Sequence, residues 1–168
     1  MLMERAEPNP PMPNIEEILA LDLLTLREHT ELAGDILDPN VHRNLLALSL
    51  ITSEVIYVRR HGSLVAYAML KPQEDDRWFV SGFGTHPDHR DATVFRELFA
   101  KLSLLVQRRS IGSLRSNVYK TNRLSMAFHK RLGFRVSREN SKAVEFTATV
   151  DELSSASRAV RQVATRPG

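Results

Sequence analysis

Three short, strand-like segments between residues 54 and 85 constrain the fold more than any other feature of this sequence. They are rich in β-branched and aromatic residues, which favour strands. His61 and Gly62 fit a tight hairpin turn between the first two, and a polar loop at 71–77 leads to the third. Short connections of this kind predict an antiparallel meander. The segments are EVIYVRR (54–60), SLVAYAML (63–70) and WFVSGFGT (78–85), the last of which ends before Pro87.

Helical periodicity surrounds this meander. The clearest helix follows it, with Asp91 placed as its N-cap and a broad apolar face of Val94, Phe95, Leu98, Phe99, Leu102, Leu105 and Val106. Before the meander, Asp38 to Asn40 begins a second helix, with an apolar stripe of Val41, Leu45, Leu46, Leu48 and Ile51. Residues 15–33 also show helical spacing, but LDLLTLRE (21–28) fits a first strand equally well.

The rest of the chain completes one domain over residues 15–150. SLRSNVY (113–119), FRVS (134–137) and AVEFTATV (143–150) are expected strands, and 122–134 is a short helix. Residues 1–14 hold four prolines and few large apolar groups, so we expect a mobile tail. Residues 151–168 are expected to form a C-terminal helix or tail.

Composition excludes several classes of function. The 168 residues are 42% hydrophobic, enough for one domain with its own core. The absence of cysteine excludes disulfides, thiolate metal sites and a cysteine nucleophile. No apolar run reaches the roughly twenty residues of a membrane span, and the N-terminus lacks the apolar core of a signal peptide. We therefore expect a soluble, cytoplasmic protein that does not bind a membrane.

Charge is distributed unevenly along the chain. Residues 1–89 carry 7 basic and 14 acidic side chains, whereas residues 90–142 carry 13 basic and 3 acidic ones. A basic segment suits a polyanionic partner, such as a phosphorylated cofactor or a nucleic acid, although a solvated basic face is equally compatible. Nucleic acid is the weakest of these interpretations because the segment lacks interleaved aromatic residues and a recognition-helix motif.

The helix NRLSMAFHKRLGF (122–134) carries the candidate catalytic residue. Gly133 can supply the left-handed conformation that ends the helix, and Phe134 can then pack back on the last turn. Asn122 and His129 lie two turns apart, with Ser125 one turn before His129, so the three point to nearly the same side. A histidine alone at such a position is more often a packed or hydrogen-bonded residue than a catalyst.

The order of elements and two motifs resemble the GNAT superfamily of N-acetyltransferases from about Glu54 to Val150. The motifs are THPDHR (85–90), similar to the end of the family's fourth strand, and N-x-x-S-x-x-F-H-x-x-L-G-F from Asn122. The resemblance implies an α/β (α+β) fold with a mixed, mostly antiparallel central sheet flanked by helices and a splayed pair of strands.

The resemblance also implies transfer of an acyl group, most simply acetyl from acetyl-CoA, to a primary amine that attacks the thioester directly. Pantetheine would bind at Phe83, Gly84 and Thr85, and His129 would be the general acid for the CoA thiolate if its imidazole stays charged. The pyrophosphate would bind amides at a helix N-terminus. The implied cofactor-binding residues there are Arg90, Ala92, Thr93, Val94 and Phe95. Asn122 and Ser125, on the helix at 122–134, are also implied to bind the cofactor.

Two departures from the family pattern support an alternative, a catalytically inactive binding or regulatory module. The family's pyrophosphate loop has small residues at the two positions where this chain has Thr93 and Phe95, and Asp91 adds a negative charge. A general base is not evident either. Asn117 stands where related enzymes can carry an acid, which leaves water or the loop residues Glu74, Asp75 and Asp76.

No histidine pair has metal-ligand spacing with a third partner, so no metal is expected. His29 and His61 look like loop residues. Family acceptor sites are built from variable loops, and the sequence defines neither the acceptor nor the oligomeric state.

Overall fold

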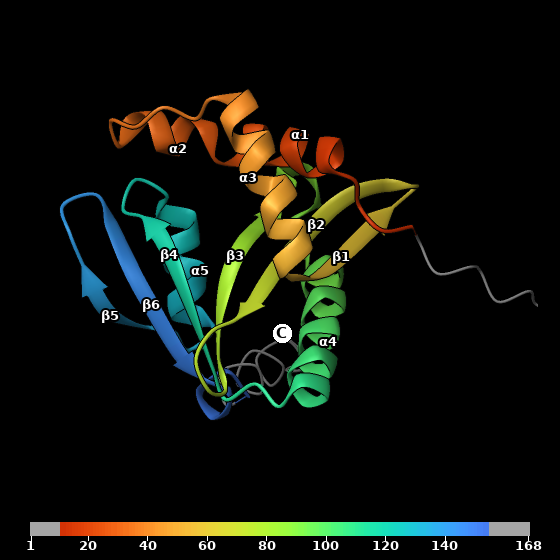
Figure 1. Cartoon of the computed structure of the whole chain (residues 1–168), viewed down its shortest axis with the longest axis vertical. Coiled ribbons are helices and arrows are strands. Elements are labelled where there is room, and N and C mark those ends of the chain that lie inside the picture. The colour runs from red at the N-terminus through yellow and green to blue at the C-terminus, as the bar shows by residue number, and fades with distance from the viewer. Residues whose placement is uncertain (1–10, 155–168) are drawn as a thin grey trace, which may run out of the picture.

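The computed structural model describes residues 11–154 and contains a single six-stranded sheet with helices on both faces (Figure 1). The arrangement of the strands confirms the expected α/β (α+β) fold with a mixed, mostly antiparallel sheet. The elements are α1 (Ile15–Thr25), α2 (Arg27–Leu32), α3 (Pro39–Thr52), β1 (Glu54–Arg60), β2 (Ser63–Pro72), β3 (Arg77–Thr85), the 3₁₀ turn η1 (Pro87–His89), α4 (Ala92–Arg109), β4 (Ser113–Tyr119), α5 (Arg123–Arg131), β5 (Arg135–Glu139) and β6 (Ala143–Thr149).

The sheet has the strand order β1-β2-β3-β4-β6-β5. The predicted meander of β1, β2 and β3 is confirmed, with His61 (φ 52°) and Gly62 (φ 80°) forming its first turn. Two consecutive residues with positive φ are the requirement of a type I′ hairpin turn. All neighbouring strands are antiparallel except β3 and β4, which run parallel. The fold thus has one parallel junction at its centre.

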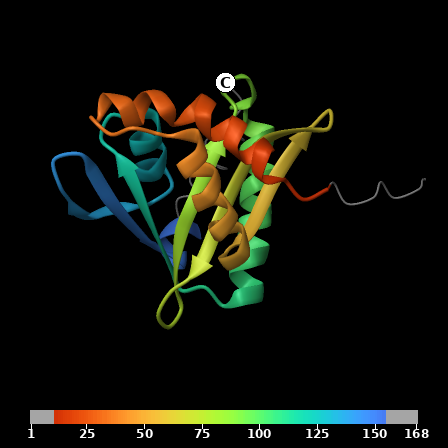
Figure 2. The same cartoon turned by 45° about the horizontal axis from the view of Figure 1, so that its top comes forward.

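Two apolar cores lie on opposite faces of this sheet. The larger one packs α4 against the sheet through Val94, Leu98 and Leu105. The smaller one packs α1 and α3 against β2 through residues such as Ile18 and Leu46. Figure 2 shows α1, α2 and α3 gathered at one side of the strands.

Residues 21–28, which fit either a helix or a strand by pattern, are helical. The reason lies at Asn14 and Glu17, which form a reciprocal capping box at the start of α1. The apolar stripe predicted for α3 is mostly not its packing face. Leu46 is buried, but the other members are exposed: Val41, Leu45, Leu48 and Ile51.

The ends of the chain are described only in part. Of the tail expected over residues 1–14, the structure describes 11–14, where the Pro11 carbonyl accepts a hydrogen bond from Arg59 and Asn14 caps α1. Of the expected C-terminal helix or tail, residues 155–168 lie outside the described residues, and Leu153 packs against the larger core. Within residues 11–154, no helix is both long and apolar enough to cross a membrane.

Candidate active site

The parallel strands β3 and β4 separate after a short paired segment. Their ladder consists of Arg77 with Ser113, Trp78 with Leu114, and Phe79 with Arg115. Beyond these pairs β3 continues to Thr85 and β4 to Tyr119 without pairing to each other, and Figure 1 shows the two arrows diverging. The predicted splayed pair of strands is therefore present, and backbone polar groups on the facing edges lack a strand partner.

A pocket of about 500 Å³ occupies this opening. Its walls come from β3, β4, α5, the start of α4 and the α1–α2 region. Eight of the sequence-predicted site residues line it: Phe83, Gly84, Thr85, Arg90, Phe95, Asn122, Ser125 and His129. The other three do not. Ala92 and Thr93 are exposed, and the Val94 side chain is fully buried in the larger core.

The N-terminus of α4 is occupied by its own cap. The Asp91 carboxylate accepts hydrogen bonds from the Val94 amide at 3.0 Å and the Thr93 hydroxyl at 2.6 Å. These bonds hold the pKa of Asp91 below its usual value, so the cap is a carboxylate at neutral pH. An anion at this helix end would compete with Asp91 for the same amides.

Aromatic rings close the side of the pocket that faces α4. The Phe128 ring lies 5.0 Å from Phe95 and 5.6 Å from Phe83, centroid to centroid. Phe95 therefore turns toward α5, as its helical phase predicts, instead of projecting along the helix axis. Beside this cluster, Arg90 Nε donates to Thr85 Oγ1 at 3.1 Å, which places a guanidinium between the end of β3 and the start of α4.

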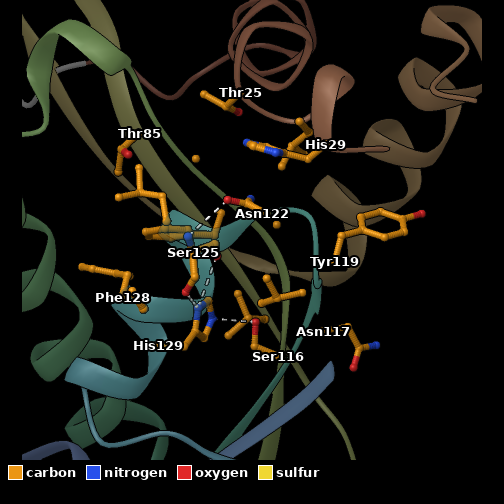
Figure 3. Close-up of a pocket in the computed structure, with 18 of the residues that line it drawn as sticks. Thr25, His29, Thr85, Ser116, Asn117, Tyr119, Asn122, Ser125, Phe128 and His129 are labelled. Carbon is orange, nitrogen blue, oxygen red and sulfur yellow. Dashed lines mark hydrogen bonds between the residues drawn. The ribbon is translucent and has the colours of Figure 1, made fainter. Parts of the chain in front are cut away.

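His129 is held at both ring nitrogens (Figure 3). Nδ1 lies 2.8 Å from the Ser125 carbonyl oxygen, and because a carbonyl only accepts, Nδ1 carries a proton. In the neutral ring Nε2 therefore accepts from the Ser116 hydroxyl at 3.0 Å. The ring also stacks on Phe146 and meets the edge of Phe134, each at 5.0 Å. The predicted packing of Phe134 on the last helical turn is confirmed, as is Gly133 with φ 98°.

Burial lowers the pKa of His129, only partly offset by the bond to Ser125. The side chain is 6% exposed. The neutral imidazole is thus the resting form near pH 7, whereas the general-acid role expected from the sequence needs a charged ring. Any proton that leaves through Nε2 must pass Ser116, a buried pocket residue that sequence reasoning did not select.

A second polar network, also missed, supports β3 from the opposite face. Asp22 on α1 is buried and accepts hydrogen bonds from the Tyr67 hydroxyl and, at 2.7 Å, from His42 Nε2. The Tyr67 ring lies against Gly82 and Gly84, where an added Cβ would come within 3.1 and 3.0 Å of it. The sequence did contain a signal for this network, because Asp22 stands at a position of α1 where the helical repeat places apolar residues.

His29 was expected in a loop, but it lies in α2 and lines the pocket. No group of three His, Asp or Glu side chains among residues 11–154 could hold a metal ion.

Comparison with known families agrees with this geometry. The model of the acetyltransferase (GNAT) family matches residues 20–134, which is more than half of the chain. The chain belongs to the acetyltransferase (GNAT) family. No curated protein matches the sequence.

Solved structures show the same fold at low sequence identity. PaiA N-acetyltransferase from Thermoplasma acidophilum, in complex with coenzyme A, is 12% identical with a TM-score of 0.64, over 80% of this chain and 92% of that one. A GNAT acetyltransferase from Staphylococcus aureus is 11% identical with a TM-score of 0.65, over 81% and 92%. The ribosomal-protein-S18-alanine N-acetyltransferase from Escherichia coli is 15% identical with a TM-score of 0.59, over 83% and 90%.

Proposed function

We propose that this protein is an acetyl-CoA-dependent N-acetyltransferase that acetylates a primary amine by direct attack on the thioester. The opening between β3 and β4 carries this proposal, because it places unpaired backbone and most of the sequence-predicted residues around one pocket. The family membership and the coenzyme A bound in the T. acidophilum structure support acetyl-CoA as the donor.

The donor would lie along β3, with the pantetheine amides bonded to backbone groups at Phe83 to Thr85. Arg90 would meet the phosphates at the start of α4. An unpaired strand amide would stabilise the oxyanion of the tetrahedral species. The thioester would then face His129 on α5 and Ser116 on β4, which both line the pocket.

In this arrangement we assign His129 as the proton donor for the departing thiolate, acting with Ser116. When Nε2 is protonated, it donates to Ser116 Oγ, and the hydroxyl proton of Ser116 can turn toward sulfur. Because the resting ring is neutral, Nε2 first takes up a proton that the attacking amine gives up. Burial lowers the pKa of the resulting imidazolium, so this proton is readily passed on to the thiolate.

A second candidate is a binding module without catalysis. The Asp91 carboxylate favours it, because its hydrogen bonds occupy the helix end where the family is expected to hold pyrophosphate. Such a module would bind CoA weakly and transfer nothing.

Two measurements on the full chain separate these functions. Isothermal titration with acetyl-CoA gives the donor affinity. Transfer of the radiolabelled acetyl group is then measured with four acceptors: benzylamine, tyramine, spermidine and a peptide with an N-terminal alanine. We expect binding, turnover of at least one amine, and a loss of about a hundredfold or more in kcat for His129→Gln. Binding of acetyl-CoA without turnover of any amine would favour the binding module. If neither binding nor turnover is seen at millimolar acetyl-CoA, the proposal that this protein is an acetyltransferase is refuted.

A further inference from the structure

The described walls of the pocket hold no aspartate or glutamate. The titratable side chains there are His29, Arg90, Tyr119, His129 and Arg131. A primary amine must be deprotonated before it attacks a thioester, so an acetyltransferase site without a carboxylate must give the proton to another side chain or to water. The acids considered from sequence, Glu74, Asp75 and Asp76, lie between β2 and β3 and do not line the pocket.

Most of these titratable side chains either make hydrogen bonds within the protein or cannot accept a proton. His129 is bonded at both nitrogens. The Tyr119 hydroxyl donates to Asp35 Oδ2 at 2.8 Å, and burial and this carboxylate raise the Tyr119 pKa. Arginine stays protonated and cannot accept a proton. His29 is the remaining titratable residue of the pocket, in the described part of the chain, and a neutral imidazole has a nitrogen that can accept a proton.

His29 presents an unengaged imidazole. Its Nδ1 is buried without a hydrogen-bond partner in the described structure, and no hydrogen bond to Nε2 occurs there either. The residue is fixed through its backbone instead, since the Thr121 hydroxyl donates to the His29 carbonyl at 2.7 Å. Figure 3 shows the His29 ring entering the pocket from the side opposite His129. The imidazole therefore has hydrogen-bonding capacity that no protein group in the described structure uses.

From this geometry we infer that His29 is the general base for the acceptor amine and that the acceptor enters beneath α2. The inference rests on the proposed acetyltransferase function. His29 takes one proton from R–NH₃⁺, and the free amine forms the C–N bond to the thioester carbonyl carbon. The C–S bond then breaks. The remaining surplus proton passes from the nitrogen through Ser116 to the free Nε2 of His129, and the departing thiolate takes this proton back through Ser116. The products are R–NH–CO–CH₃, CoA–SH and one proton released from His29 to water.

This assignment divides the pocket between the two substrates. Arg90 and Phe95 lie at the donor end, near the start of α4, whereas Thr25, His29 and Thr30 form the α1–α2 wall. The α1–α2 wall carries no acidic group to pair with a second positive charge. The acceptor class that fits is therefore a monoamine, such as an aromatic amine or a peptide N-terminus, in preference to a polyamine.

The test compares wild type with His29→Gln and His29→Ala, using the best amine of the panel above. At pH 7 we expect kcat/KM to fall about a hundredfold or more in both variants, with the acetyl-CoA dissociation constant unchanged. The residual rate should rise steeply with pH as the free amine fraction grows, and added imidazole should partly restore His29→Ala. Glu28→Gln, one residue away on α2 and outside the pocket wall, is the matched control and should keep wild-type kinetics.

Failure of the His29 assignment can be told apart from failure of the proposed acetyltransferase function. If His29→Gln turns over like wild type, or if the loss is independent of pH and not restored by imidazole, His29 is not the base while the acetyltransferase function stands. If wild type neither binds acetyl-CoA nor acetylates any amine, the proposed function falls and the inference falls with it. Spermidine outpacing every monoamine would overturn the acceptor class.

Discussion

At the scale of single residues, Asp91 has two opposing effects. Its carboxylate caps α4, which is its normal and stabilising position at a helix N-terminus. The same carboxylate places a negative charge where the proposed donor brings its phosphates. Stability of the helix and affinity for a polyanion therefore pull in opposite directions at this residue.

Replacing Asp91 with Asn separates the two effects, because an amide oxygen still caps a helix while the charge is gone. We expect Asp91→Asn to tighten acetyl-CoA binding several-fold at low salt, with a smaller gain at 0.5 M salt, where charges are screened. Titration calorimetry at two salt concentrations measures this. Asp151→Asn removes an exposed acid at the end of β6 and should leave the affinity unchanged; equal effects of the two variants would mean that only net charge matters.

At the scale of elements, the proposed acceptor wall depends on one short helix. Six residues are too few for a helix to be stable by itself, so α2 must be held by its surroundings. Three hydrogen bonds tie this region to the end of β4 and to the β5–β6 turn: Tyr119 to Asp35, Lys142 to Asp35 at 2.7 Å, and Thr121 to His29. We call Asp35, Tyr119, Thr121 and Lys142 the latch.

The latch should control how firmly α2 covers the pocket. The hydrogen bonds from Lys142 and Tyr119 lower the pKa of Asp35, so the latch stays charged well below neutral pH. We expect Asp35→Asn to speed hydrogen–deuterium exchange over residues 27–38 and to raise KM for the amine, with acetyl-CoA affinity unchanged. Glu31→Gln, which removes only an exposed ion pair with Arg27, is the control. Unchanged exchange in Asp35→Asn would show that other contacts hold α2.

The elements also show where sequence reasoning succeeds. The turn at His61 and Gly62, the cap at Asp91 and the stop at Gly133 follow from local chemistry, and all three are present. Periodicity alone left the choice between helix and strand at 21–28 open. Asn14 and Glu17, three residues apart, have the spacing of a capping box and so favoured the helix. The exposed stripe of α3 was not predictable, because its packing side is set by Leu46 and by His42 reaching Asp22 on another helix.

At the scale of the whole molecule, the site joins segments about a hundred residues apart. The motif residues Asn122, Ser125 and His129 could be chosen from sequence because one helix aligns them. Ser116 and His29 could not, since they reach the pocket only because β3 and β4 part and α2 lies over the gap. Their selection needed the tertiary arrangement, whereas the chemistry of the helix needed only its spacing.

His129 also links the site to global stability. Its ring packs between α5 and the sheet, and burial sets its pKa below the value of about 6.5 expected in the unfolded chain. As pH falls through that unfolded value, the unfolded state binds the proton first, so the native state loses stability. This contribution is fully present at pH 7.5 and declines on acidification.

We therefore expect the free energy of unfolding in urea to fall more steeply between pH 7.5 and 5.5 in wild type than in His129→Gln. One proton limits the difference to about 1.4 kcal/mol per pH unit. His61→Asn is the control, because asparagine tolerates the positive φ of that exposed turn. Parallel pH profiles for wild type and His129→Gln would show that His129 has the same pKa in both states.

The ring of Tyr67 has a consequence for engineering this protein. It fills the room that side chains at Gly82 and Gly84 would need, and its hydroxyl is anchored to Asp22. A larger residue at Gly84 would press on the Tyr67 ring and on Leu21 of α1, and one at Gly82 would meet the Met69 side chain and the same ring. Substrate preference is therefore better redesigned from the α2 side than along this strand.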